Sequence, residues 1–181
     1  MRKHIEGFIG QLEDAFSIGK KIQFSIPNKK LSNVLILGVG GSGIGGTIVA
    51  KTALLGAGIP VMTCNDYHIP EYVNETTLVI ACSYSGNTEE TLISCEKSFK
   101  KTSNIIGISK GGNLFNLLKN NGINEYVKMP EGFQPRAALG FAFALMLILL
   151  NKIKMINDSL ICDLKNSIPQ LKEKTKEYSL E

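Results

Sequence analysis

Two short segments rich in glycine or hydroxyl residues constrain the fold of this chain most. Residues 38–46 read GVGGSGIGG and follow the apolar run 34–37, while residues 83–88 read SYSGNT and follow the apolar run 78–81. An apolar run that ends in small residues is typical of a buried strand leading into a helix. A helix start carries unpaired N–H groups and a partial positive charge, so it binds anions readily. Two such turns of different chemistry predict a pocket for a phosphorylated small molecule.

Predicted strands and helices alternate along the rest of the chain. The apolar patterns predict strands at 33–37, 60–65, 76–83, 104–109 and 125–129, and helices near 42–55, 87–100, 113–119 and 136–153. Amphipathic helices are predicted at 3–19 and at about 159–178, the second interrupted by Pro169. Alternation of this kind favours an α/β three-layer sandwich, with a five-stranded parallel sheet and extra helices at both ends. Ligands then bind at the carboxyl ends of the strands, where both turns lie.

Composition excludes several classes of function. The chain has 181 residues and a net charge of +4, which suits one α/β domain with scattered lysines and no nucleic-acid-binding stripe. The longest apolar run, residues 137–150, is too short to cross a membrane and suits a buried helix. We therefore expect neither nucleic acid nor membrane as a partner.

Cysteine and histidine usage bears on location and chemistry. The four cysteines have no CxxC spacing, which favours buried reduced thiols in a cytoplasmic protein. With only two histidines, there is almost no material for a zinc cluster or a Ser-His-Asp triad. We expect no metal and no cofactor.

The first loop leaves a rival interpretation open. Gly38, Gly40 and Gly43 satisfy GxGxxG, and Asp66 lies after the second strand, where a dinucleotide-binding domain places its ribose-binding carboxylate. A Walker motif is absent, and Ile44 breaks the GxSxG pattern around Ser42. A purely structural alternative is a glycine turn needed for tight strand–helix packing.

The second loop has the chemistry of a phosphate site. Ser83, Ser85 and Thr88 place three hydroxyls around Gly86, and each hydroxyl can donate a hydrogen bond to a phosphate oxygen. Gly86 allows the backbone to approach a ligand closely. The alternative is an ordinary helix cap, although a cap needs only one hydroxyl.

Three segments together resemble a known family. GVGGSGIGG, SYSGNTEET at 83–91 and PRAALG at 135–140 resemble the bifunctional phosphoglucose/phosphomannose isomerases, within the wider sugar isomerase (SIS) domain superfamily, over about residues 30–150. The resemblance implies a flavodoxin-like SIS fold, and conversion of glucose 6-phosphate or mannose 6-phosphate to fructose 6-phosphate through a cis-enediolate. It also implies a homodimer or a contact with a second SIS domain.

The resemblance also assigns site residues. It implies that Ser83, Ser85 and Thr88 bind the phosphate, that Gly41 and Ser42 lie against the substrate, and that Arg136 stabilises the enediolate. A guanidinium suits that role because it keeps its proton and presents a fork of donors to a developing negative charge.

The family has two SIS subdomains, and this chain holds about one. We expect residues 1–155 to form the SIS domain with its N-terminal helix, and residues 156–181 to form a helical segment or linker toward a second SIS domain. The family's glutamate base and ring-opening histidine belong to the other half, so the chain alone should be inactive or weakly active. A non-catalytic sugar-phosphate sensor and a NAD-binding Rossmann domain remain as alternatives.

Overall fold

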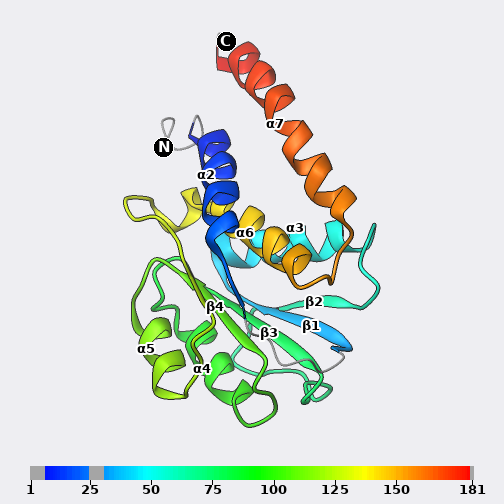
Figure 1. Cartoon of the computed structure of the whole chain (residues 1–181). Helices are drawn as coiled ribbons and strands as arrows, with labels where there is room; N and C mark the ends of the chain where they lie inside the picture. Colours follow the sequence, from blue (N-terminus) through cyan, green and yellow to red (C-terminus); the bar gives the residue numbers. More distant parts are fainter. Residues whose placement is uncertain (1–6, 25–30, 180–181) are drawn as a thin grey trace.

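The sheet of this protein is parallel and lies between two layers of helices. A computed structural model describes residues 7–24 and 31–179 (Figure 1). Five strands pair in the order β2-β1-β3-β4-β5, and all four pairings are parallel. The strands are β1 (Asn33–Leu37), β2 (Val61–Cys64), β3 (Thr77–Cys82), β4 (Ile105–Ser109) and β5 (Tyr126–Lys128). The predicted α/β three-layer fold is confirmed.

The central strands are apolar throughout because both faces of the sheet are covered. All residues of β3 and β4 are buried. Alternate residues divide between two cores: Ile36 and Ile80 face one core, whereas Leu35 and Val79 face the other. Successive side chains of a strand point to opposite faces of the sheet, so each run of hydrophobic residues contributes to both cores.

Helices cover the two faces in unequal numbers. The larger core is covered by α2 (Phe8–Lys21), α3 (Gly40–Ala53) and α6 (Leu139–Lys152), and the smaller by α4 (Glu89–Ser98) and α5 (Asn113–Asn120) (Figure 1). Helix α6 is apolar on every side because it packs against α2 and α3 and shares the larger core with the sheet. The expectation that residues 137–150 form an enclosed helix is confirmed for the α6 part of that run.

The last helix is continuous, and the expected interruption at Pro169 is wrong. Helix α7 (Asp158–Ser179) runs straight through Pro169 and extends away from the sheet (Figure 1). Its first half packs on the domain, where Leu160 and Ile168 join the larger core, and Lys172 forms an ion pair with Glu13 of α2. Part of this segment is therefore integral to the fold.

Other differences concern the element ends. The long helix predicted from Arg136 is split, because Pro135–Ala137 form a short 3₁₀ turn, η1, before α6 begins at Leu139. Helix α2 is described only from Phe8, so residues 3–6 of the predicted first helix lie outside the described residues. Within 7–24 and 31–179, no helix combines the length and the apolar character needed to span a bilayer.

Candidate functional site

The glycines of the first loop are required by close backbone contacts. A Cβ on Gly38 would lie 3.0 Å from the carbonyl oxygen of Cys82, and a Cβ on Gly43 would lie 2.7 Å from that of Gly38. Gly40 has a φ of +58°, a conformation that side chains disfavour. The loop consequently turns sharply from β1 into α3, close to the end of β3.

The second loop turns from β3 into α4 through a hydroxyl network. The buried Oγ of Ser83 lies 2.8 Å from Oγ1 of Thr88 and accepts a hydrogen bond from the Gly86 N–H at 3.1 Å. The Oγ of Ser85, which is partly exposed, accepts a hydrogen bond from the Asn87 N–H at 3.1 Å. Ser83 therefore shapes the loop, while Ser85 and Thr88 are the more accessible hydroxyls.

The starts of both helices lack a cap from the side chain at the N-cap position. Val39 and Thr88 occupy the N-cap positions of α3 and α4, and neither side chain makes a capping hydrogen bond. The first-turn N–H groups of both helices are thus not capped by these side chains, as a site for an anion requires. The alternative of an ordinary helix cap is not met by Thr88, because its hydroxyl pairs with Ser83 instead.

A direct hydrogen bond joins the two loops. The Oγ of Ser42, which is buried, accepts a hydrogen bond from the Tyr84 N–H at 3.3 Å. Ser42 also lies against Cys82, where its hydroxyl partly offsets the burial that raises the pKa of the Cys82 thiol to about 12. These contacts follow from the strand order, because β1 and β3 are neighbours and their chains diverge to opposite faces at this point.

The turn that carries Arg136 lies directly on the first loop. A Cβ on Gly41 would stand 2.8 Å from the carbonyl oxygen of Pro135 and 3.2 Å from the Cα of Arg136. The Arg136 side chain is exposed. A segment almost a hundred positions further along the chain is thereby placed at the same edge of the sheet as both loops.

One continuous set of contacts thus joins the two loops and the Arg136 turn, which carry the residues that the resemblance assigned to the substrate. Thr88 contacts Ser83, whose neighbour Tyr84 contacts Ser42, whose neighbour Gly41 contacts the Arg136 turn. Sequence analysis missed two further residues at this place, Gln11 and Tyr84. Tyr84 stands inside the SYSGNT segment, but nothing in the sequence signals that α2 reaches this edge.

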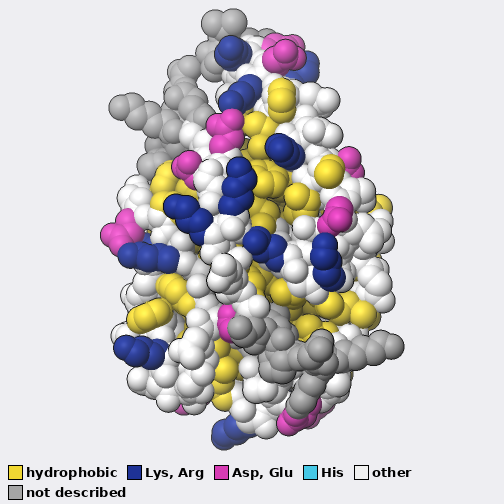
Figure 2. All heavy atoms as spheres, viewed as in Figure 1, with side chains coloured by type: hydrophobic (Ala, Val, Ile, Leu, Met, Phe, Trp, Pro, Cys, Tyr) yellow, Lys and Arg dark blue, Asp and Glu magenta, His cyan; other side chains and the backbone are white. Residues whose placement is uncertain are grey.

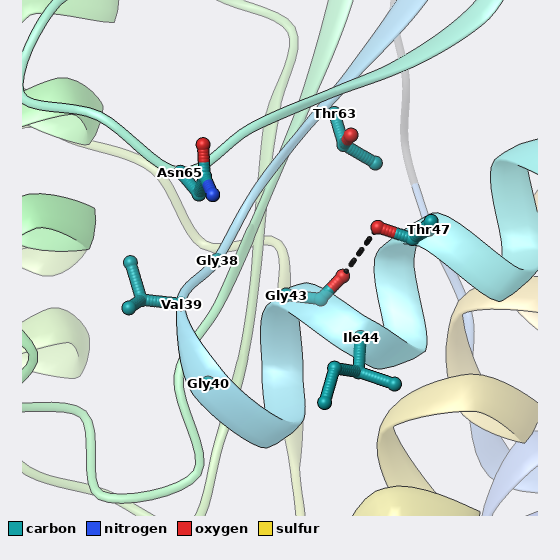
Figure 3. Close-up of a pocket in the computed structure, with 8 residues that line it drawn as sticks. All are labelled: Gly38, Val39, Gly40, Gly43, Ile44, Thr47, Thr63 and Asn65. Carbon is teal, nitrogen blue, oxygen red and sulfur yellow. Dashed lines mark hydrogen bonds between the residues drawn. The ribbon is translucent and has the colours of Figure 1, made fainter.

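A cavity of about 270 Å³ is lined in part by the first loop. Thr63 and Asn65, from β2 and the residues after it, face the first turns of α3 across this cavity (Figure 3). None of the hydroxyl residues of the second loop lines it. The first loop thus lines this cavity and also contacts the second loop and the Arg136 turn.

Asp66 does not line that cavity. Its Oδ1 accepts hydrogen bonds from the N–H groups of Tyr67, at 2.6 Å, and His68. The Tyr67 N–H is the main cause that lowers the pKa of the Asp66 carboxyl. The carboxylate that suggested a ribose-binding role is thus engaged in its own loop.

Clusters of metal-binding type do not occur among the described residues. No group of three His, Cys, Asp or Glu side chains in 7–24 and 31–179 could hold a metal ion. On the face in Figure 2, Lys and Arg side chains are scattered among Asp, Glu and hydrophobic residues.

Curated relatives of this chain carry one name repeatedly. The chain is 42% identical over 146 residues to a bifunctional phosphoglucose/phosphomannose isomerase of Caldicellulosiruptor bescii, covering 81% of the chain and 43% of the relative. The chain is homologous to the phosphoglucose/phosphomannose isomerases. A relative of the same name from Aquifex aeolicus is 35% identical over 178 residues, which covers 98% of the chain and 53% of that protein. The chain spans about half the length of these phosphoglucose/phosphomannose isomerases. No protein-family model matches it.

Solved structures support the fold. The C-terminal domain of glucosamine-fructose-6-phosphate aminotransferase from Francisella tularensis matches with a TM-score of 0.70 at 18% identity, covering 96% of this chain and 54% of that one. The Vibrio vulnificus NanR protein, solved with ManNAc-6P, matches with a TM-score of 0.56 at 18% identity, covering 98% of this chain and 66% of that one. These likenesses concern the fold alone.

Proposed function

We propose that this chain is the N-terminal, substrate-binding half of an isomerase that converts glucose 6-phosphate or mannose 6-phosphate to fructose 6-phosphate. The observation that carries the proposal is the contact between the Arg136 turn and the first loop, which is itself hydrogen-bonded to the second loop. Relatives at 35–42% identity, each named a phosphoglucose/phosphomannose isomerase, support the same reaction.

In this proposal the second loop binds the phosphate. Ser85 and Thr88 donate hydrogen bonds from their hydroxyls, and the first-turn N–H groups of α4 add to them. Ser83, which the resemblance also assigns to the phosphate, is buried and supports Thr88 instead. A phosphate ester carries about −1.5 to −2 charges and three acceptor oxygens, which this donor set matches. Gly41 and Ser42 then lie against the sugar, because the first loop is adjacent to the second.

Arg136 then stabilises the enediolate. Removal of the C2 proton places negative charge on the C1 and C2 oxygens, and a guanidinium lowers the energy of that intermediate without giving up a proton. No residue of this chain is assigned as the base. A general base contributes about 10²–10⁴ in rate, so the chain alone should bind the sugar phosphate but turn it over weakly or not at all.

Calorimetry with this chain tests the proposal. We expect binding of fructose 6-phosphate and tighter binding of 5-phosphoarabinonate, a mimic of the enediolate. The double substitution Ser85→Ala/Thr88→Ala should weaken the binding of both ligands. Arg136→Ala should weaken the binding of the mimic more than that of fructose 6-phosphate. Failure of the folded chain to bind either ligand at millimolar concentration contradicts the proposal.

A sensor of a sugar phosphate is the second candidate, favoured by the NanR structure that holds ManNAc-6P. A coupled assay for glucose 6-phosphate formation distinguishes the two candidates when it is run on a chain that includes any sequence following Glu181. Turnover there supports the isomerase, and tight binding without turnover supports the sensor.

A second SIS domain, or a second copy of this chain, is proposed to cover the outer side of α3. Ile44 is 56% exposed and Leu55, just beyond the helix, is 80% exposed, with Ile48 between them. Residues four positions apart share one side of a helix, so Ile44 and Ile48 lie together on α3 and, with Leu55, expose apolar surface. Ile48→Glu should then shift sedimentation toward a monomer, and an unchanged profile opposes the self-association.

The four free cysteines support a cytoplasmic location.

A further inference from the structure

We propose that Tyr84 and Gln11 are positioning residues, which hold the Arg136 turn against the two substrate loops. This inference rests on the proposed function, because fixing the turn affects the reaction only if Arg136 acts on the substrate. Neither side chain is proposed to touch the substrate. Each one binds the backbone of the segment that carries Arg136, from a different part of the fold.

Tyr84 holds the segment that leads into the turn. Its hydroxyl donates to the carbonyl oxygen of Pro130 at 3.0 Å and accepts from the Phe133 N–H at 2.9 Å. The side chain is only 3% exposed, and both hydrogen bonds are partly buried. Tyr84 lies between Ser83 and Ser85, so this one residue connects the second loop to the segment that carries Arg136.

Gln11 of α2 binds the end of the turn. Its Nε2 donates to the carbonyl oxygen of Ala137 at 2.7 Å, joining α2 to a residue 126 positions later. Gln11 is 1% exposed, and its Oε1 has no hydrogen-bond partner among the described residues. A buried acceptor without a partner costs stability. Burial of a glutamine here, where an apolar side chain would avoid that cost, is explained if its N–H group holds the turn.

The turn needs such support because it is too short to maintain itself. Its own hydrogen bonds are from the Ala137 N–H to the carbonyl oxygen of Gln134, at 2.8 Å, and from the Ala138 N–H to that of Pro135, at 3.4 Å. A 3₁₀ helix of three residues has poor hydrogen-bond geometry. The contact with Gly41 stops the turn from moving closer to the first loop, while Tyr84 and Gln11 prevent it from moving away.

Amide hydrogen exchange tests the holding role without any ligand. Tyr84→Phe removes one oxygen and keeps the buried ring, and Gln11→Met keeps the volume without the donor. Both should accelerate exchange in residues 131–138 by about five- to tenfold, the effect of losing about one hydrogen bond. Tyr126→Phe is the matched control, because the Tyr126 hydroxyl also bonds within the fold, to Ser109. Exchange in residues 131–138 that stays at the wild-type rate in Tyr84→Phe overturns the inference, even if Gln11→Met does not fold.

Ligand binding tests whether holding the turn serves Arg136. Tyr84→Phe should weaken the binding of 5-phosphoarabinonate about three- to tenfold and change the affinity for fructose 6-phosphate by less than about twofold. Arg136→Ala should shift the two affinities in the same direction. In an Arg136→Ala background, Tyr84→Phe should not change the affinity for the mimic any further, because Tyr84 is proposed to affect that affinity only through Arg136.

Two outcomes separate this inference from the proposed function. If Tyr84→Phe weakens both ligands equally and adds to Arg136→Ala, its role is general stability and the inference fails, while the proposed function stands. If the folded wild-type chain binds neither ligand, the proposed function fails, and hydrogen exchange still decides whether Tyr84 and Gln11 hold the turn.

Discussion

Gly41 lies so close to Pro135 that a Cβ on Gly41 would stand 2.8 Å from the Pro135 carbonyl oxygen. Both partners are backbone, so neither can rotate away to make room. The contact joins a glycine at the start of α3 to the turn before α6. A single methyl group at position 41 must therefore move one of the two segments that we propose to act on the substrate.

The substitution Gly41→Ala should displace the Arg136 turn. We expect a loss of about 1–3 kcal/mol in the free energy of unfolding, typical of overpacking, and weaker binding of 5-phosphoarabinonate. Gly10→Ala is the control: it lies in α2 with no atom within 4 Å of the added Cβ, and it should stabilise the chain by about 0.5–1 kcal/mol. Equal unfolding curves for Gly41→Ala and wild type would contradict the geometry.

Ser83 and Ser85 should separate structural from binding effects. Ser83→Ala removes the buried Oγ that pairs with Thr88 and Gly86, so it should cost about 1–3 kcal/mol in urea denaturation. Ser85→Ala affects a partly exposed hydroxyl and should cost no more than about 0.5 kcal/mol, while weakening fructose 6-phosphate in calorimetry. A stability loss at Ser85 as large as that at Ser83 would argue against this division.

Gly86→Ala should be among the most damaging single changes. Gly86 has a φ of +72°, and its added Cβ would lie 1.7 Å from the carbonyl oxygen of Gly111, a backbone atom. Gly122→Ala is a matched control, since Gly122 has a φ of +75° but no atom within 4 Å. Thermal unfolding should show Gly86→Ala to be less stable than Gly122→Ala by about 1–3 kcal/mol, the part due to crowding rather than to φ. Similar melting temperatures for the two variants would be evidence against a crowded loop contact.

Alkaline pH should destabilise the fold through two buried thiols. Burial raises the pKa of Cys82 and of Cys95 from 9.0 to about 12. Between these values the unfolded chain loses the thiol protons and the folded chain keeps them, so stability is fully present below pH 9 and falls as the pH rises toward 12. Each thiol contributes up to about 1.4 kcal/mol per pH unit in this window.

Urea denaturation at several pH values from 8 to 11 measures this loss. The variant Cys82→Ala/Cys95→Ala should show a flatter decline than wild type, although its stability at pH 8 is lower because of the cavities left behind. Cys162→Ala is the control, because Cys162 is exposed. Parallel declines for wild type and the double variant would show that these thiols do not control the alkaline transition.

Local sequence determined the elements and their order. The apolar runs before GVGGSGIGG and SYSGNT become β1 and β3, and the alternation of patterns gives the parallel five-stranded sheet. These features depend on periodicity and on glycine, which act over a few neighbouring residues. The placement of both loops at one edge also follows from sequence, since the carboxyl ends of parallel strands meet there.

Tertiary packing decided what local patterns could not. Pro169 lies inside α7 without interrupting it, because the helix is supported by packing of Leu160 and Ile168 against the larger core. Arg136 sits in a separate 3₁₀ turn, and the segment that carries it contacts Gly41, Tyr84 and Gln11. None of these partners is near Arg136 in the chain.

The sequence by itself therefore determined that this protein has two short loops that lead from strands of a parallel sheet into helices. Only the tertiary structure decided that Arg136 joins them and that Gln11 of the first helix reaches the same turn. The physical reason is distance along the chain: turns and strands are specified by neighbouring residues, whereas the site depends on contacts between segments up to 126 positions apart.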